Sequence, residues 1–220
     1  MAWYSGPTDA YDHGILGDAV EPTVLHGWSV VTSARCGLSV AAGPGHVFED
    51  VAPRLADLDG DGRAELIAVR TSVTKGAQLA VYGVRDEVLM LLDATPYIGQ
   101  PHRWLAPVGA ADLDGDGTVE IAFVDRPHLA RVLRVWRWMP RGLVEVAAAE
   151  GVTVHRIGET DIAGGVRDCG QGPEMVVASG DWTRLLAVRL SDGRLTARGI
   201  GRDTSRPAFA RALGCAPGTR

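Results

Sequence analysis

The stretch Asp57-Leu58-Asp59-Gly60-Asp61-Gly62-Arg63-Ala64-Glu65 decides the fold of this chain, because it recurs about 55 residues later as Asp112-Leu113-Asp114-Gly115-Asp116-Gly117-Thr118-Val119-Glu120. Both copies carry acidic residues at their first, third, fifth and ninth positions. Both lead into an apolar run that is typical of a β-strand. Self-similarity at a fixed spacing predicts a fold built from copies of one small unit.

Two strand-like runs follow each loop, separated by a turn, and a third copy further along the chain has the same pair of runs. The first runs are Leu66–Val69, Ile121–Val124 and Glu174–Val177. The second runs are Leu79–Tyr82, Leu133–Trp136 and Leu186–Arg189. These runs are rich in Val, Leu and Ile and are bounded by Gly, Pro and Asp, so they predict strands and an all-β chain.

Units of about 50 residues with three or four short strands suit the blades of a small β-propeller. We expect one domain over residues 1–220, with units at approximately 45–98, 99–150 and 151–200. The terminal segments 1–44 and 201–220 would complete a fourth, composite blade, to which Ala208–Leu213 contributes a strand. A five-bladed propeller and a β-sandwich are the alternatives.

Four carboxylates in nine residues predict a hard-cation site in each loop, since a tightly curved backbone lets alternate residues point inward at one ion. Glycines between the acidic residues permit that curvature. We expect two Ca²⁺ ions, each bound by three Asp side chains, one main-chain carbonyl and one Glu. The expected ligands are Asp57, Asp59, Asp61, Arg63 and Glu65 in the first loop, and Asp112, Asp114, Asp116, Thr118 and Glu120 in the second.

An EF-hand does not fit, because its acidic twelfth position is Ala68 in one loop and Phe123 in the other, and helices are not predicted on either side. A metal-free turn would leave four carboxylates repelling one another. Mg²⁺ prefers a more rigid octahedral geometry. In the third copy the three Asp positions hold Val166, Asp168 and Gly170, which predicts a unit that keeps its strands without the metal.

The loop Ala-Asp-Leu-Asp-Gly-Asp-Gly, followed by Glu and an apolar strand, resembles the FG-GAP and VCBS repeats of integrin α-subunit propellers and of many bacterial exported proteins. The resemblance covers residues 50–190. It implies a propeller with structural calcium in loops between blade strands, and it implies hardly any chemistry. The chain is too short for seven blades and keeps only fragments of the Phe-Gly and Gly-Ala-Pro signatures, such as Pro107–Ala110. Blade number and partner are therefore not carried over.

The charge and hydropathy of the chain indicate which classes of partner and which cellular locations are expected. The net charge is −5, and Lys and Arg are scattered, which disfavours nucleic acid. No apolar run reaches the roughly 18 residues of a membrane span. No signal peptide is present, and Met1 can be read as an initiator added to a mature exported chain, so we expect a periplasmic or extracellular protein whose leader has been removed. A cytoplasmic protein is the alternative.

A recurrent basic signature precedes the first strand of each unit. In a propeller these positions can surround one mouth of the central channel and bind an anion or a transition metal. The alternative is that each side chain only holds its own loop. The residues are His46, His102, Arg103, His155, Arg156 and Arg206.

Three cysteines permit one disulfide. Cys169 lies in the third loop and Cys215 follows the expected closing strand, so we expect these two to pair, with free thiols as the alternative. Cys36 is read as an unpaired core residue.

No Gly-x-Ser-x-Gly elbow, phosphate-binding glycine loop or HExxH zinc motif occurs, and no catalytic residue is assigned. The sequence favours a calcium-stabilised module that binds a protein or a glycan. Trp136 and Trp138 would share one strand face and could stack on a sugar. The alternative function is a hydrolase or lyase that acts at the His/Arg ring.

Overall fold

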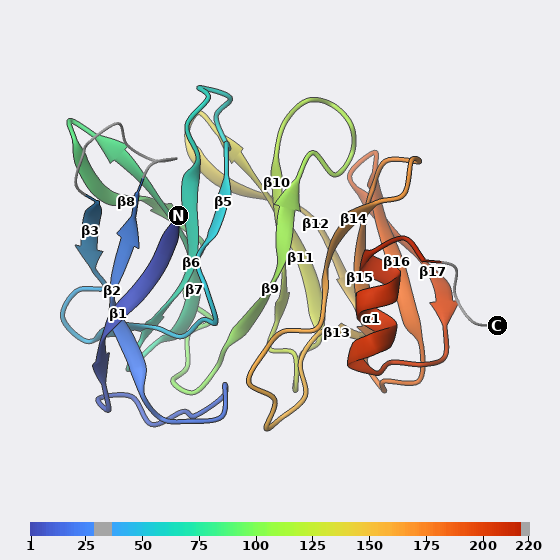
Figure 1. Cartoon of the computed structure of the whole chain (residues 1–220), viewed down its shortest axis with the longest axis horizontal. Helices are drawn as coiled ribbons and strands as arrows, with labels where there is room; N and C mark the ends of the chain where they lie inside the picture. Colours follow the sequence, from blue (N-terminus) through green and yellow to red (C-terminus); the bar gives the residue numbers. More distant parts are fainter. Residues whose placement is uncertain (29–36, 217–220) are drawn as a thin grey trace. The chain divides into compact units, whose positions relative to one another are not determined.

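The computed structural model describes residues 1–28 and 37–216, which leaves Cys36 outside the described residues. The described chain forms four β-sheets and one short helix (Figure 1). The prediction of an all-β chain is confirmed. No helix in these two ranges is long and apolar enough to cross a membrane.

The chain divides into two compact units. The first contains residues 1–105, 140–143 and 157–160, and the second contains residues 106–139, 144–156 and 161–220.

The first unit holds two sheets. One has the order β1-β2-β3, and the other has the order β4-β6-β7-β8 with β5 also paired to β6. The strands are β1 (Ala2–Thr8), β2 (Glu21–Gly27), β3 (Leu38–Ala41), β4 (His46–Phe48), β5 (Arg54–Ala56), β6 (Glu65–Ser72), β7 (Gly76–Arg85) and β8 (Val88–Ala94). Leu25, from the small sheet, packs with Phe48, Leu66 and Tyr82 from the larger one, so one apolar core joins the two sheets.

The second unit also holds two sheets, with the orders β12-β11-β10-β9 and β13-β15-β16-β17; β14 pairs with β15 as well. The elements are β9 (Leu105–Ala111), β10 (Glu120–Asp125), β11 (Val132–Met139), β12 (Gly142–Glu150), β13 (Val152–Thr153), β14 (Gly165–Asp168), β15 (Pro173–Ser179), β16 (Leu185–Ser191), β17 (Arg194–Gly201) and α1 (Arg206–Leu213).

Burial falls in the same direction across the three larger sheets. The strand that follows the predicted loop is almost wholly buried, as in β6, β10 and β15. The last strand of each sheet, β8, β12 or β17, exposes much of its length. The predicted first and second runs all lie within strands β6, β7, β10, β11, β15 and β16, so these strand predictions are confirmed.

The predicted closing strand over Ala208–Leu213 is wrong, because this segment is helix α1. Ser205 caps its N-terminus by accepting a hydrogen bond from the Ala208 amide, and a proline occupies the first turn, where the missing N–H costs nothing. Phe209 and Ala212, three residues apart, then face the same core as Val176 of β15. In the described part of the C-terminal segment, a helix covers its sheet instead of extending a composite blade.

Candidate metal centre

Each predicted loop connects two strands of one sheet. The first joins β5 to β6 and the second joins β9 to β10, so the strand flanks that argued against an EF-hand are present. Gly60 and Gly62 have φ values of +74° and +84°, and Gly115 and Gly117 have +80° and +91°. A Cβ atom at these positions would meet no heavy atom within 4 Å, so glycine is favoured here by the backbone conformation and not by lack of space.

The loop carboxylates shape their own backbone in the same way in both copies. Asp57 accepts hydrogen bonds from the amides of Gly60 (2.8 Å) and Gly62 (3.0 Å), as Asp112 does from Gly115 (2.8 Å) and Gly117 (2.9 Å). The Asp at position 3 accepts from the amide of position 5, and the Asp at position 5 accepts from the amide of position 7. Each of these latter carboxylates uses its Oδ1 for this hydrogen bond within the loop.

The glutamates at position 9 lie underneath the loops. Glu65 is 3% exposed and accepts from the Leu58 amide (2.9 Å), whereas Glu120 is fully buried and accepts from the Leu113 amide (2.8 Å). Burial raises the pKa of both carboxyls above its usual value. An ionised carboxylate in this position needs a positive charge nearby.

The donor sets fit a hard cation. Oxygen atoms of Asp57, Asp59 and Asp61 lie within 4.8 Å of one another, and so do those of Asp112, Asp114 and Glu120. Carboxylate oxygens are the ligands that Ca²⁺ prefers. The carbonyl ligands proposed at Arg63 and Thr118, and the nature of the ion, stay predictions.

The second loop differs from the first because Arg137 of β11 reaches into it. Its Nε donates to Glu120 Oε1 (2.6 Å), and its Nη1 and Nη2 donate to Asp116 Oδ2 and Asp114 Oδ2 (2.8 Å each). In the first loop the comparable contact is looser: Arg85 Nη2 lies 3.6 Å from Asp59 Oδ2, and the arginine is 47% exposed. Sequence reasoning did not find Arg137.

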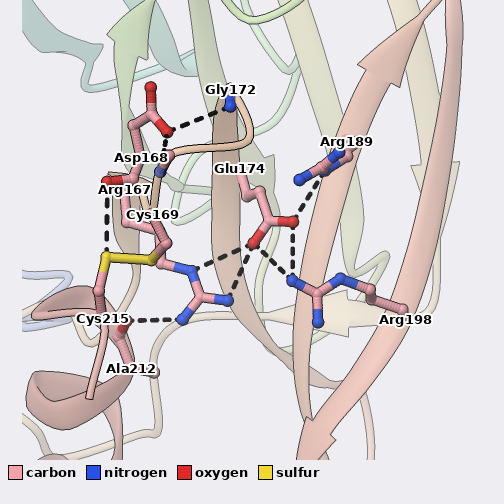
Figure 2. Close-up of a disulfide and its surroundings, with 10 residues drawn as sticks. Arg167, Asp168, Cys169, Gly172, Glu174, Arg189, Arg198, Ala212 and Cys215 are labelled. Carbon is pink, nitrogen blue, oxygen red and sulfur yellow. Dashed lines mark hydrogen bonds and ion pairs between the residues drawn. A yellow bond between two sulfur atoms is a disulfide. The ribbon is translucent and has the colours of Figure 1, made fainter. Parts of the chain in front are cut away.

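The third loop has exchanged its acidic set for an arginine cluster around the buried Glu174 (Figure 2). Arg167 Nη2 (2.9 Å), Arg189 Nε (2.8 Å) and Arg198 Nη2 (2.8 Å) all donate to this carboxylate. Burial opposes its ionisation, but the hydrogen bonds from Arg198, Arg167 and Arg189 outweigh burial and lower the pKa to about 2. The remaining Asp168 still shapes the turn, accepting from the Gly170 and Gly172 amides.

A disulfide joins Cys169 in this loop to Cys215 after α1 (Figure 2). Arg167 Nη1 also donates to the Ala212 carbonyl (2.7 Å), which ties the same loop to the last turn of the helix. Beside the disulfide is a pocket of 310 Å³ that α1 and β17 line together, with Arg198 and Arg211 among its walls. The loop without the acidic set is thus held by a covalent bond and by ion pairs.

The histidines and arginines of the predicted ring each have partners in their own unit. In the first unit, His46 bonds to the Pro44 carbonyl and to the Tyr97 hydroxyl (2.8 Å each), and His102 Nε2 lies 2.8 Å from Asp12. Arg103 donates to the His102 carbonyl. Convergence of the six residues on one pocket stays a prediction.

In the second unit, His155 is fully buried and its Nδ1 lies 3.0 Å from Nε2 of His128. Arg156 stacks on the Trp182 ring, with 4.0 Å between the guanidinium carbon and the ring centroid. Arg206 pairs with Asp161 at 2.7 Å. Each of these three side chains therefore has a partner within the second unit.

A buried acidic group in the first unit was also not anticipated. Glu49 is fully buried and pairs with His13 and with the Thr71 hydroxyl. Glu21 is buried nearby; burial and repulsion from Glu49, Asp18 and Asp50 raise its pKa to about 8. No sequence motif marks these positions, because their partners come from separate strands and loops.

Neither the protein-family models nor the curated proteins searched gave a match to the chain.

Proposed function

We propose that this protein is an exported, calcium-stabilised β-propeller that binds a protein or a glycan and performs no chemistry itself. The observation that carries the proposal is the pair of loops in which converging carboxylates stand above a buried glutamate, each at the start of a buried strand. A cation bound there would neutralise the loop and fix the entry to that strand.

A structural role for the loops is supported by the hydrogen bonds that their carboxylate oxygens accept from main-chain amides. The Asp side chains hold the amides of their own turn, and Glu65 and Glu120 hold the amides of Leu58 and Leu113. Carboxylates committed to the backbone and to a cation are poor proton donors or acceptors for a substrate. This favours a binding module over an enzyme.

The propeller arrangement is supported by the repeated decline in burial from the strand after the loop to the last strand of each larger sheet. Blades of a propeller show this pattern because their inner strands are surrounded and their outer strands meet solvent. We keep four blades in the proposal, since the described residues form four sheets.

Export is supported by the disulfide between Cys169 and Cys215, since such bonds persist in oxidising compartments such as the periplasm or the cell exterior.

Partner binding is supported by apolar side chains on an outer strand. On β8, Val88, Met90 and Leu91 are all exposed. An exposed apolar edge strand is an unusual feature of a monomeric surface and is suited to contact with another macromolecule.

The decisive experiment is a thermal melt of the metal-stripped protein with and without Ca²⁺, followed by isothermal titration calorimetry. Added Ca²⁺ should raise the melting temperature, and a chelator should reverse the rise; the stabilisation is about 2.7 kcal/mol per site when the free ion is 100 times its dissociation constant. The control is Asp57→Asn/Asp61→Asn, which removes two ligands of the first loop. Melting curves that do not respond to Ca²⁺ would refute the calcium role.

The binding role needs its own measurement. The calcium-loaded protein is immobilised and exposed to a glycan array and to extracellular proteins, with Val88→Asp/Met90→Asp as a surface variant. A glycan or protein that the wild type retains and this variant does not would support the proposal. Turnover in a panel of ester, glycoside and uronide substrates would overturn it in favour of an enzyme.

A further inference from the structure

We infer that Arg137 is a built-in cation that competes with Ca²⁺ in the second loop, so that the first loop is the tight calcium site and the second a weaker one. The inference rests on the proposed calcium-binding role of the loops. The two loops would therefore differ in affinity although their acidic residues occupy the same positions.

The geometry places the guanidinium of Arg137 among the oxygens that would hold the ion. Its three donating nitrogens contact three of the four acidic side chains, Asp114, Asp116 and Glu120, at 2.6–2.8 Å. Two of these, Asp114 and Glu120, belong to the set whose oxygens converge. The arginine side chain is only 18% exposed, so solvent screens it weakly. An ion and a guanidinium cannot use the same lone pairs together.

Strand register explains why the second loop has this arginine and the first loop does not. Glu120 pairs directly with Arg137 across β10 and β11. In the first unit Leu66 pairs with Tyr82, so the position opposite Glu65 is Gly83, which has no side chain. Arg85, at the end of β7, makes only the looser contact to Asp59 described above.

The third loop also has an arginine opposite its glutamate, and it has fewer acidic residues. Met175 pairs with Val188, so the residue opposite Glu174 is Arg189, whose Nε donates to it at 2.8 Å. Two further arginines join it there, and two of the three Asp positions have lost their carboxylates. The three loops thus form a series at one register position: glycine with a full acidic set, arginine with a full acidic set, and arginine with the glutamate and a single Asp.

Removal of the competing charge should strengthen calcium binding in the second loop. Two like charges a few ångströms apart repel each other, and they do so more strongly near a protein surface than in bulk water. We therefore expect Arg137→Met to raise the calcium affinity of the second loop at least about tenfold. The same variant without calcium should be less stable than wild type, because Glu120 loses its buried partner.

The test isolates the second loop by placing Asp57→Asn/Asp61→Asn in the background. Calorimetric titration with CaCl₂ alone then compares Arg137 with Arg137→Met and with Arg137→Lys, a control that keeps the charge but loses the planar fork. We expect Met to give the tightest binding and Lys to stay near wild type. Thermal melts without calcium verify that each variant is folded.

The reverse exchange tests the first loop. Gly83→Arg, made in a background with Asp112→Asn/Asp116→Asn, should lower the calcium affinity of the first loop by a similar factor. A Cβ at Gly83 would approach a methyl group of Leu92 to 2.6 Å, so Gly83→Ala is the matched control for the steric effect.

The outcomes separate this inference from the proposed function. Two wild-type sites of equal affinity that Arg137→Met leaves unchanged would overturn the inference and leave the calcium role intact. Absence of calcium binding in wild type and in every variant would overturn both. Weaker binding in Arg137→Met would show that Arg137 organises the site instead of competing for it, which also overturns the inference.

Discussion

Removal of the disulfide between Cys169 and Cys215 should cost the second unit a large share of its stability. The two cysteines are 46 residues apart in sequence, and the bond closes a loop that contains β15, β16, β17 and α1. In the chain-entropy treatment, a loop of this length stabilises the folded state by about 4 kcal/mol. Double replacement Cys169→Ser/Cys215→Ser is the direct perturbation.

Helix α1 would not detach completely in this variant. Phe209 and Ala212 remain packed against the sheet, and Arg167 still donates to the Ala212 carbonyl. The loss should therefore appear as a lower unfolding midpoint of a folded protein. For a chain of this size each kcal/mol shifts the melting temperature by about 2–4 °C, which gives a decrease of about 8–16 °C.

Differential scanning calorimetry and urea unfolding followed by tryptophan fluorescence measure this change. Cys36→Ser is the control, since it removes a cysteine and leaves the disulfide in place. Titration of free thiols in the unfolded wild type should find one. Three free thiols in protein purified without reductant, or a double variant as stable as Cys36→Ser, would refute the reasoning.

Two acidic residues give opposite pH dependences. Glu174 has a pKa lowered from 4.5 to about 2, so the stability that its ionised form gives the fold is complete above pH 4.5 and is lost as pH falls toward 2. Glu174→Gln should therefore cost about 3 kcal/mol of folding stability at pH 7 and little at pH 2. Urea titrations at pH 7 and pH 2.5 measure this difference, and an equal loss at both would contradict it. Glu21, with a pKa raised to about 8, holds its proton in the folded protein, so stability falls as pH rises from 4.5 toward 8. Glu21→Gln should therefore stabilise the protein by about 3 kcal/mol at pH 7 and have no effect at pH 4, and a destabilised variant at pH 7 would show that the carboxyl is ionised there.

The strands and the loops could be predicted because their signals are local. Apolar runs bounded by Gly and Asp marked β6, β10 and β15, and the spacing of Asp and Gly in the loops defines the turn itself. The helix over Arg206–Leu213 could not be found in this way. Its eight residues are too few for a helical period to stand out, and its packing against β15 is tertiary.

The arginines that contact Glu120 and Glu174 could not be predicted, because the sequence does not specify the register between paired strands. In the comparison of the repeats, the run that begins at Leu186 corresponds to the run that begins at Leu133. In the structure the residue equivalent to Leu133 is Leu185, because Leu185 pairs with Ala178 as Leu133 pairs with Val124. A slip of one residue turns every side chain of a strand to the other face. With that slip Arg189 aligned with Trp136, and the shared position of Arg137 and Arg189 was hidden.

The disulfide has a mechanical consequence as well. A pulling force applied to the chain beyond Cys215 would pass through the sulfur atoms to Cys169 and so into the turn after β14. Helix α1 and the β16–β17 hairpin lie inside the closed loop, outside this path of tension, and would keep their hydrogen bonds while β14 is pulled from β15. Under load from its C-terminal side, the second unit should therefore yield first at the four residue pairs between β14 and β15 and not by unravelling from its end.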